Sequence, residues 1–222
     1  MSEESELSTR ERLIAAAGEL FGKKGFHATS IREICAMAGA NVASVNYHFQ
    51  DKDKLAEEVL VHVLQWGSDA HPIDRVINPG RPPEEQLFAF VRRFLLTRID
   101  PARPTWHEMV MFREMIEPGP NMNSVVERAI RRNAEVLFGI VRGLLGEAAP
   151  RVFVERCQHC VIGQCIHFVH HRRVVERIHP GLIDCSPEGI EAMARHITDF
   201  SLAAIRNIPL PKPENDMLEG GA

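Results

Sequence analysis

A short stretch of helical pattern carries neighbouring side chains with hydrogen-bonding groups: Ser44, Asn46, Tyr47 and His48. An asparagine amide can form two hydrogen bonds to adenine, a serine hydroxyl can bond to several bases, and Tyr or His can contact phosphates or base edges. Lys52 follows, where an ammonium group can neutralise a phosphate. These residue types at this spacing predict contacts to double-stranded DNA.

Two helices joined by a tight turn can hold these side chains outward. Ser30 and Glu33 form a capping box, which predicts a helix that starts at about Thr29. Gly39 can adopt the left-handed conformation that ends a helix, and the next helix follows after about three residues. This is the spacing of a helix-turn-helix, the motif that places its second helix in the major groove.

The apolar positions around this motif predict how it packs. On its second helix, Val42, Val45 and Phe49 share one face, and we expect them to pack against the first helix. An earlier helix starts at a second possible capping box, Ser8 with Glu11. Three helices in such a short segment make a compact unit that depends on the rest of the chain for stability.

The run from Thr9 to Leu55 resembles the N-terminal domain of TetR-type bacterial transcriptional regulators. The resemblance lies in the helix end LFGKKGF, in Thr29 and Gly39, and in the sequence YHF followed by Lys52 and Leu55. It implies an all-α homodimer with a DNA-binding head and a larger domain that senses a ligand and dimerises. The residues that it places at or near DNA are Thr29, Ser44, Asn46, Tyr47, His48 and Lys52. The predicted DNA-binding set also includes Ser30, Arg32, Val42 and Ala43.

The C-terminal half carries a second resemblance. The segments FREMIEPGPNMNSVVERAIRRNAEVLFGIVRGLLG and VIGQCIHF are similar to a TetR subgroup whose C-terminal half is a separately defined family of effector domains. The expected domains are therefore a helix-turn-helix DNA-binding domain at 1–54, an effector-binding and dimerisation domain at 55–208, and a disordered tail at 209–222. Helical periodicity and the placement of prolines predict a connector helix from Lys52 to about Gly67, a loop at 68–83, and helices at about 84–99, 105–117, 121–145, 150–178 and 187–207.

The two last long helices carry apolar stripes that fit a dimer interface, as the resemblance implies. We expect an isolated chain to expose both stripes to water, and a symmetric partner would bury them. Packing of both stripes against the core of the same chain is the alternative. The predicted interface residues are Cys157, Val161, Gln164, Cys165, Phe168, Met193, Ile197, Phe200 and Ala204.

The resemblance also implies an effector pocket inside the C-terminal domain. Aromatic and methionine side chains can form its apolar walls, and a few polar groups can orient the ligand. The candidates are Trp106, His107, Met109, Phe112, Arg113 and Met115.

The segment CQHCVIGQCIHFVHHRR offers a different chemistry. Cys157, Cys160, His167 and His171 share one helix face, and thiolates and imidazoles bind zinc or copper. A straight helix spreads the four residues over about 21 Å, so a single ion would need ligands from elsewhere. A metal- or thiol-redox-responsive regulator therefore stays an alternative to packing by these side chains.

Composition and motifs argue against several other classes of protein. The net charge of −4 argues against general coating of nucleic acid, although residues 8–54 hold seven basic and five acidic residues. We expect no membrane span, a cytoplasmic location and reduced cysteines. The sequence contains no G-x-S-x-G motif, phosphate-binding loop, dinucleotide-binding fingerprint or H-E-x-x-H motif, so no enzyme and no cofactor are expected. A helical adaptor that only binds protein would leave Asn46, Tyr47 and Lys52 without a role.

Overall fold

The protein is all-α, as predicted. The computed structural model describes residues 7–68, 70–76, 78, 80–99, 103–117 and 122–210, and within these ranges it contains no β-strand. The predicted tail at 209–222 lies outside the described residues apart from Pro209 and Leu210. Within the same ranges, we find no helix with the length and hydrophobicity that are needed to cross a bilayer.

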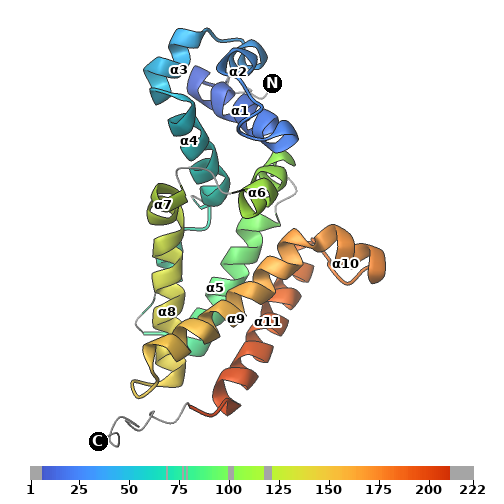
Figure 1. The fold of residues 1–222 in the computed structure, drawn as a ribbon. Helices are drawn as coiled ribbons and strands as arrows, with labels where there is room; N and C mark the ends of the chain where they lie inside the picture. Colours follow the sequence, from blue (N-terminus) through green and yellow to red (C-terminus); the bar gives the residue numbers. More distant parts are fainter. Residues whose placement is uncertain are drawn as a thin grey trace, which may run out of the picture. The chain divides into compact units, whose positions relative to one another are not determined.

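The helical elements follow one another with short connections (Figure 1). In chain order they are α1 (Thr9–Lys24), α2 (Ile31–Ala38), α3 (Val42–Phe49), α4 (Lys52–Gln65), the 3-10 turn η1 (Ile73–Arg75), α5 (Pro83–Arg98), α6 (Trp106–Ile116), α7 (Met122–Val125), the π-helical turn η2 (Val126–Ile130), α8 (Arg131–Leu145), α9 (Arg151–His170), α10 (Arg172–Ile178) and α11 (Pro187–Asn207).

Most of the predicted helices are found close to their predicted bounds, and 187–207 matches α11. The prediction of one helix at 150–178 was wrong, because His171 leaves the helical conformation and separates α9 from α10. The segment 121–145 contains the π-helical turn η2, in which each backbone hydrogen bond spans one residue more than in an α-helix. The loop at 68–83 contains the short turn η1.

The described residues cluster into two compact units. The first unit comprises Met1–Ala70 and Asp100–Asn133, and the second comprises His71–Ile99 and Ala134–Ala222. This division differs from the predicted boundary between 54 and 55, because α4 and α6 both pack on α1. Which segments bind DNA and which bind an effector stays a prediction.

The first unit forms around buried aliphatic side chains of α1, α2 and α4. Leu13, Ile34, Leu55 and Val59 are fully buried in its core. Both predicted capping boxes are confirmed, since Ser8 and Ser30 accept bonds from the amides three residues later and receive the reciprocal glutamate bonds. These caps explain why α1 and α2 begin where they do.

Helix α6 is anchored to α1 by Trp106. A Cβ atom at Gly18 would lie 2.2 Å from the Trp106 ring, so only glycine leaves room for the indole at this point of α1. The His62 ring of α4 stacks on the indole at 6.1 Å, and the buried His107 ring lies 4.1 Å from it. Trp106 therefore joins α1, α4 and α6 in one core.

A buried carboxylate lies on α4. The Glu57 side chain is 3% exposed and accepts hydrogen bonds from Ser124 Oγ, from Lys54 Nζ at 2.9 Å and from Arg128 Nη1 at 2.8 Å. Arg128, which lies in η2, also pairs with Glu58 at 2.6 Å. Burial alone would raise the pKa of Glu57, but these hydrogen bonds more than offset it and hold the pKa at about 2.

Removing this charge should change how stability depends on pH. The folded-state pKa of Glu57 lies below the ordinary 4.5, so its stabilising contribution is complete above that pH and is lost as the pH falls toward about 2. We expect Glu57→Gln to be less stable at neutral pH and to lose less stability between about pH 5 and 2. Urea unfolding across this range measures the effect. Glu147→Gln, which makes the same substitution at a side chain that is 90% exposed, is the control and should keep the stability at neutral pH within about 0.5 kcal/mol of wild type.

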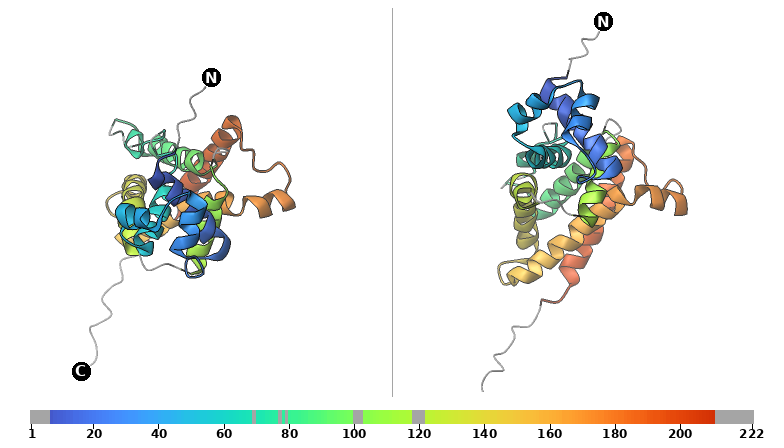
Figure 2. Two further views of the ribbon diagram at one scale, coloured as in Figure 1. Left: turned by 90° about the horizontal axis from the view of Figure 1, so that it is seen from above. Right: turned by 45° about the horizontal axis from the view of Figure 1, so that its top comes forward.

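The second unit has its own core, built by α5, the part of α8 from Ala134, α9, α10 and α11. Its largest fully buried side chains are Leu87, Phe90, Leu95, Leu137 and Ile197. Helix α5 packs on both α9 and α11, and the right view of Figure 2 shows α9 and α11 next to each other. A hydrogen bond of 3.1 Å from Gln164 Nε2 to Ser201 Oγ connects these two helices.

Candidate nucleic-acid interface

The predicted helix-turn-helix is formed by α2, a short turn and α3. Gly39 ends α2 in the left-handed conformation, with φ 62° and ψ 39°. Asn41 caps α3, because its side-chain oxygen accepts a bond of 2.8 Å from the amide of Ser44. Val45 and Phe49 are buried against the rest of the first unit, as predicted. The turn and the caps therefore hold α3 with one face inward and one face outward.

The outward face of α3 carries polar side chains that can contact DNA. Tyr47 is 85% exposed, Asn46 is exposed, and the His48 ring lies edge-on to Tyr47 with centroids 4.9 Å apart. The Ser44 hydroxyl is half-buried and donates to Asn41 Oδ1 at 3.0 Å. The expectation that Val42 packs inward was wrong, since it lies in the first turn of α3 and is 44% exposed.

Two further predicted contacts lie at the start of α2. Ser30 is the N-cap residue, and its hydroxyl donates to Glu33 Oε2 at 2.7 Å. Arg32 is exposed in the first turn of the helix, and Ala43 is exposed at the start of α3. The structure thus places most of the predicted set at the surface of the helix-turn-helix.

Thr29 and Lys52 differ from the rest of the predicted set. The Thr29 side chain is 2% exposed, and its hydroxyl donates to the carbonyl oxygen of Gly25 at 2.8 Å. Lys52 Nζ donates to the carbonyl oxygens of Phe26 and Thr29, both at 2.9 Å. Both side chains are turned toward the loop between α1 and α2.

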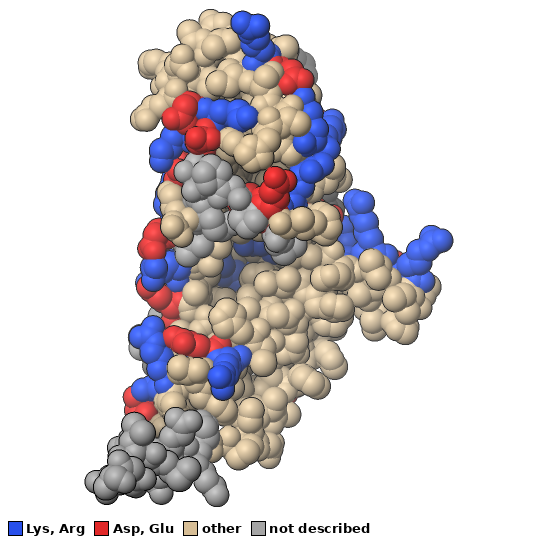
Figure 3. All heavy atoms as spheres, viewed as in Figure 1, with Lys and Arg blue, Asp and Glu red and all other residues tan. Residues whose placement is uncertain are grey.

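The charge of the first unit is mixed. Figure 3 shows basic and acidic side chains interspersed over α1 to α4. Lys23 pairs with Glu19 at 3.0 Å, and Lys24 pairs with Glu33. On the face that Figure 3 shows, opposite charges alternate, so this face offers phosphates no continuous basic patch.

The candidate effector residues are distributed between the core and the surface. Trp106 and His107 are buried in the core of the first unit, whereas Met109 and Phe112 are 42% and 60% exposed. Arg113 donates from Nε to the carbonyl oxygen of Gly22 and from Nη2 to that of Lys23, both at 2.8 Å, and so ties α6 to the end of α1. The side chain of Met115 lies outside the described part of the chain.

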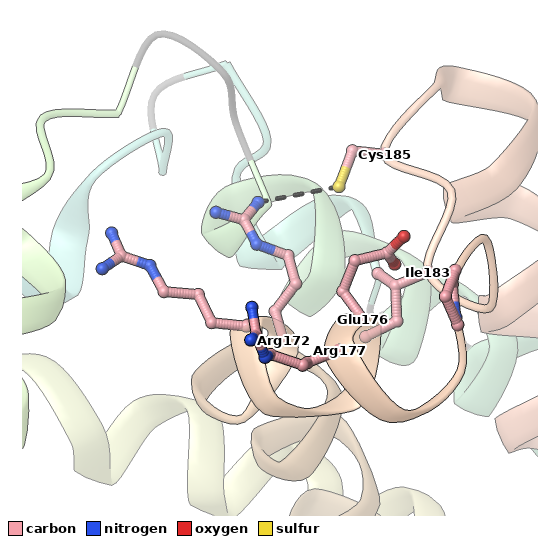
Figure 4. A pocket seen from close by; sticks show the side chains of 7 residues that line it. Arg172, Glu176, Arg177, Ile183 and Cys185 are labelled. Carbon is pink, nitrogen blue, oxygen red and sulfur yellow. Dashed lines mark hydrogen bonds between the residues drawn. The ribbon is translucent and has the colours of Figure 1, made fainter.

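An open pocket in the second unit contains none of these candidates. It is formed by α10 and the loop that leads to α11 (Figure 4), and Arg172 donates to the sulfur of Cys185 at 3.6 Å across it. Its lining residues are Arg172, Arg173, Glu176, Arg177, Pro180, Ile183 and Cys185. The carboxylate of Glu176 accepts a bond of 2.8 Å from the amide of Gly181.

The cysteine and histidine face of α9 is not a metal centre as far as the described residues show, since no three potential ligands come together there. Cys157 is buried, Cys160 is exposed, and the rings of His167 and His171 stack at 5.0 Å. Burial raises the pKa of the Cys157 thiol and raises that of Cys165 to about 12, which keeps both thiols protonated and unreactive. The metal- and redox-responsive alternatives are therefore not favoured.

Most of the predicted interface residues already pack within one chain. Cys157, Val161, Cys165, Met193 and Ile197 are buried in the core of the second unit. The argument that a single chain would expose both stripes was therefore wrong, because α5 and the neighbouring helices cover them. Of the same set, Phe200 and Ala204 are exposed, while Gln164 and Phe168 are half-buried.

The fold and the outward face of α3 together define a helix-turn-helix DNA-binding protein. Residues 13–59 match the family of bacterial regulatory proteins named tetR. Residues 83–205, more than half of the chain, match the family described as the C-terminal domain of the HTH-type transcriptional dual regulator CecR. The chain belongs to the TetR family of transcriptional regulators, whose members bind DNA and dimerise.

Three related transcriptional regulators each match a limited part of the chain. The probable HTH-type transcriptional regulator YttP of Bacillus subtilis is 43% identical over 54 residues, which are 24% of this chain and 26% of that protein. The HTH-type transcriptional repressor KstR2 of Mycolicibacterium smegmatis is 37% identical over 80 residues, 36% of this chain and 38% of that protein. The dual regulator CecR of Shigella flexneri is 39% identical over 80 residues, 36% of this chain and 33% of that protein. The chain thus matches less than two fifths of the length of each of these relatives.

Solved structures are similar to the chain over most of its length. The transcriptional regulator FadR from Bacillus subtilis, in complex with stearoyl-CoA, has a TM-score of 0.64 and 13% identity, and the match covers 86% of this chain and 97% of that one. The regulator PfmR from Thermus thermophilus has a TM-score of 0.61 and 22% identity, with 89% and 97% covered. At these identities the similarity concerns the fold.

Proposed function

We propose that this regulator is a homodimeric repressor that binds a pseudo-palindromic operator and leaves it when a small-molecule effector binds. The observation that carries the proposal is the outward face of α3, where Asn46 and the 85% exposed Tyr47 stand beside each other on a capped helix. Since chromosomal DNA would be the target, we place the protein in the bacterial cytoplasm, and we expect no catalytic activity.

The proposed DNA contacts are the predicted residues at the surface of the helix-turn-helix. In a dimer, the two copies of α3 would enter successive major grooves about 34 Å or somewhat more apart. Asn46 would contact base edges, and Arg32 would contact the phosphate backbone. The full proposed set is Ser30, Arg32, Val42, Ala43, Ser44, Asn46, Tyr47 and His48.

The dimer interface is proposed at the exposed side of α9 and α11. Cys160, Gly163 and His167 are exposed on α9, and Phe200 and Ala204 are exposed on α11. A Cβ atom at Gly163 would meet nothing within 4 Å, so a helix of a second copy could approach closely there. The 61% exposed Phe200 would supply the largest apolar contact.

Repression is supported by the role of one relative, since KstR2 is a repressor. Release by an effector is a further part of the proposal. An effector can change operator affinity only by the difference between its affinities for the two conformations of the protein. Met109 and Phe112 stay candidates for its apolar contacts, because both are exposed on α6. The buried Trp106 and His107 are better explained as core.

A footprint on the DNA upstream of the protein's own gene tests the proposal. We expect DNase I protection of two half-sites with related, inverted sequences, whose centres are about one helical turn or somewhat more apart. A small molecule that removes the protection would establish the effector. Protection that is uniform along the DNA would contradict operator recognition, and protection that no small molecule removes would contradict effector release.

Asn46→Ala should weaken binding to this operator by about 5- to 150-fold, the equivalent of about 1–3 kcal/mol for one lost two-bond contact to a base. Its thermal stability should stay within about 0.5 kcal/mol of wild type, because the side chain is exposed. Fluorescence anisotropy with the footprinted duplex measures the affinity. The same substitution at the exposed loop residue Asn78 is the matched control and should leave the affinity unchanged.

A further inference from the structure

Val42 is an exposed aliphatic side chain at the start of α3. It is the first residue of the helix and is 44% exposed, and it does not belong to the core in which Val45 and Phe49 are buried. Acidic residues are favoured in the first turn of a helix, because they stabilise the positive end of its dipole, and valine has only a modest helix propensity. Neither packing nor helix stability therefore explains a valine at this position.

The first turn of α3 differs from the first turns of the neighbouring helices. Helices α1, α2 and α4 carry Glu11, Glu33 and Asp53 there, whereas the first turn of α3 has no acidic residue. Its polar side chains are engaged in the cap, since the amide and the hydroxyl of Ser44 both donate to Oδ1 of Asn41, at 2.8 and 3.0 Å. This turn therefore presents aliphatic side chains, and no carboxylate on it would repel DNA.

Val42 and Asn46 lie on the same side of α3. They are four residues apart on one helix and both are exposed, so their Cβ atoms are about 5–6 Å from each other. In a helix-turn-helix, the N-terminal residues of the second helix contact base edges in the major groove. Because base pairs are stacked at about 3.4 Å, Val42 reaches the groove about one or two base-pair steps from the base that Asn46 contacts.

An aliphatic side chain can recognise one group in the major groove. The base edges present hydrogen-bond donors and acceptors there, and thymine adds a methyl group at C5. Packing of valine against a donor or an acceptor would remove water from that group without replacing its hydrogen bond. Packing of valine against the methyl group removes two apolar surfaces from water, which is favourable. Thymine is therefore the base that Val42 can recognise.

We propose that Val42 packs on the C5 methyl group of one thymine in each half-site, about one or two base-pair steps from an adenine that Asn46 contacts. This role rests on the proposed function, in which α3 enters the major groove. It makes Val42 a residue that determines specificity, and it assigns to each half-site a thymine and an adenine whose separation is set by one turn of α3.

Deoxyuridine in place of thymine tests the proposal with the wild-type protein, because deoxyuridine pairs as thymine does and lacks only the methyl group. Each thymine of the footprinted operator is replaced in turn, at the equivalent positions of both half-sites, and the affinity is measured by fluorescence anisotropy. We expect one position at which the affinity falls by about 15-fold, or about fourfold for each half-site, as for the loss of one buried methyl group. An operator in which no replacement lowers the affinity would overturn the proposal.

Val42→Ala shows whether this side chain is the one that reads the methyl group. Alanine is a better helix former than valine, so the variant should fold. Its affinities for the thymine operator and for the sensitive deoxyuridine operator should agree within about twofold, because the apolar contact is gone. Val152→Ala is the matched control at a 57% exposed valine in the first turn of α9, and it should keep the wild-type discrimination. Wild-type discrimination in Val42→Ala would assign the methyl group to another residue and overturn the proposal.

The position of the adenine is measured with 7-deazaadenine, which lacks the N7 acceptor to which an asparagine amide donates. The wild-type affinity should fall at one adenine in each half-site, about one or two base-pair steps from the sensitive thymine. Asn46→Ala should bind the two forms of this operator equally. A separation of about half a turn of DNA or more would contradict the shared face of Val42 and Asn46.

The outcomes keep this role and the proposed function apart. A wild-type protein that prefers the upstream operator and tolerates deoxyuridine at every position overturns the role of Val42 and leaves the proposed function standing. A wild-type protein without preference for any upstream duplex contradicts the proposed function, and the role of Val42 fails with it.

Discussion

Replacing Phe200 by glutamate is expected to separate the homodimer and to lower operator affinity by about 100- to 10,000-fold. Phe200 is 61% exposed on α11, and Ala204 lies one turn away on the same face. A carboxylate from each copy would be buried at the proposed interface without a counter-charge. When one head of a dimer has bound its half-site, the second head is held at a high effective concentration near the other half-site. A monomer lacks this advantage, which amounts to about 100- to 10,000-fold in affinity.

Analytical ultracentrifugation and fluorescence anisotropy check this prediction together. The fold of each copy should persist, because Phe200 contributes little to the core of the second unit. Phe112→Glu provides the matched control, since it makes the same substitution at a 60% exposed phenylalanine of the first unit. The control should stay dimeric. A Phe200→Glu protein that sediments as a dimer would place the interface elsewhere.

Trp106→Ala should destabilise the first unit by about 3–5 kcal/mol, the range for the loss of a large buried aromatic side chain. The indole is 8% exposed, fills the space over Gly18 and stacks on His62. Its removal would leave a cavity between α1, α4 and α6, which Gly18 cannot fill. Chemical unfolding followed by circular dichroism measures the change.

Two comparison variants define the cause of this loss. Ile116→Ala, at a 69% exposed position of the same helix, should change stability by no more than about 0.5 kcal/mol. Gly18→Ala should cost about 1–3 kcal/mol by overpacking, because its Cβ would meet the indole at 2.2 Å. If Trp106→Ala kept wild-type stability and changed only the response to an effector, Trp106 would be a wall of the ligand site and the core assignment would be wrong.

The sequence was most informative where local chemistry decides the structure. Helix α11 begins at Pro187, and Ser186 is its N-cap residue. Both residue types are favoured at these positions, so the start of the helix is visible in the sequence. The same holds for Ser30, Glu33 and Gly39 around α2. The hydrogen bonds of a helix cap join residues that are three or four positions apart, so the spacing of residue types in the sequence is enough to predict them.

The interruption at His171 had no such signal. Neither proline nor glycine stands between α9 and α10, and His171 takes φ −97° and ψ 10° within a run of residues that tolerate a helix. Periodicity correctly predicted that α9 and α11 each have an apolar face. It does not predict which neighbouring helix covers that face. Packing on α5, a contact distant in sequence, decides that five of the predicted interface residues are core.

Polar residues were the hardest to assign. Lys52 follows the recognition helix and has the residue type of a phosphate contact, yet its partners Phe26 and Thr29 precede it by more than twenty residues. Glu57 was not singled out, because one glutamate on an amphipathic helix is ordinarily solvated. Its burial depends on Ser124 and Arg128, which are far away in the sequence.

The most direct test of the central claim, that α3 recognises a particular DNA sequence, is fluorescence anisotropy with the DNA upstream of the protein's own gene. A scrambled duplex of equal length serves as the reference, and both are measured at two salt concentrations. We predict a preference of about a thousandfold or more for the upstream DNA, the lower end for specific recognition. Equal, weak and strongly salt-dependent binding to both duplexes would contradict the claim.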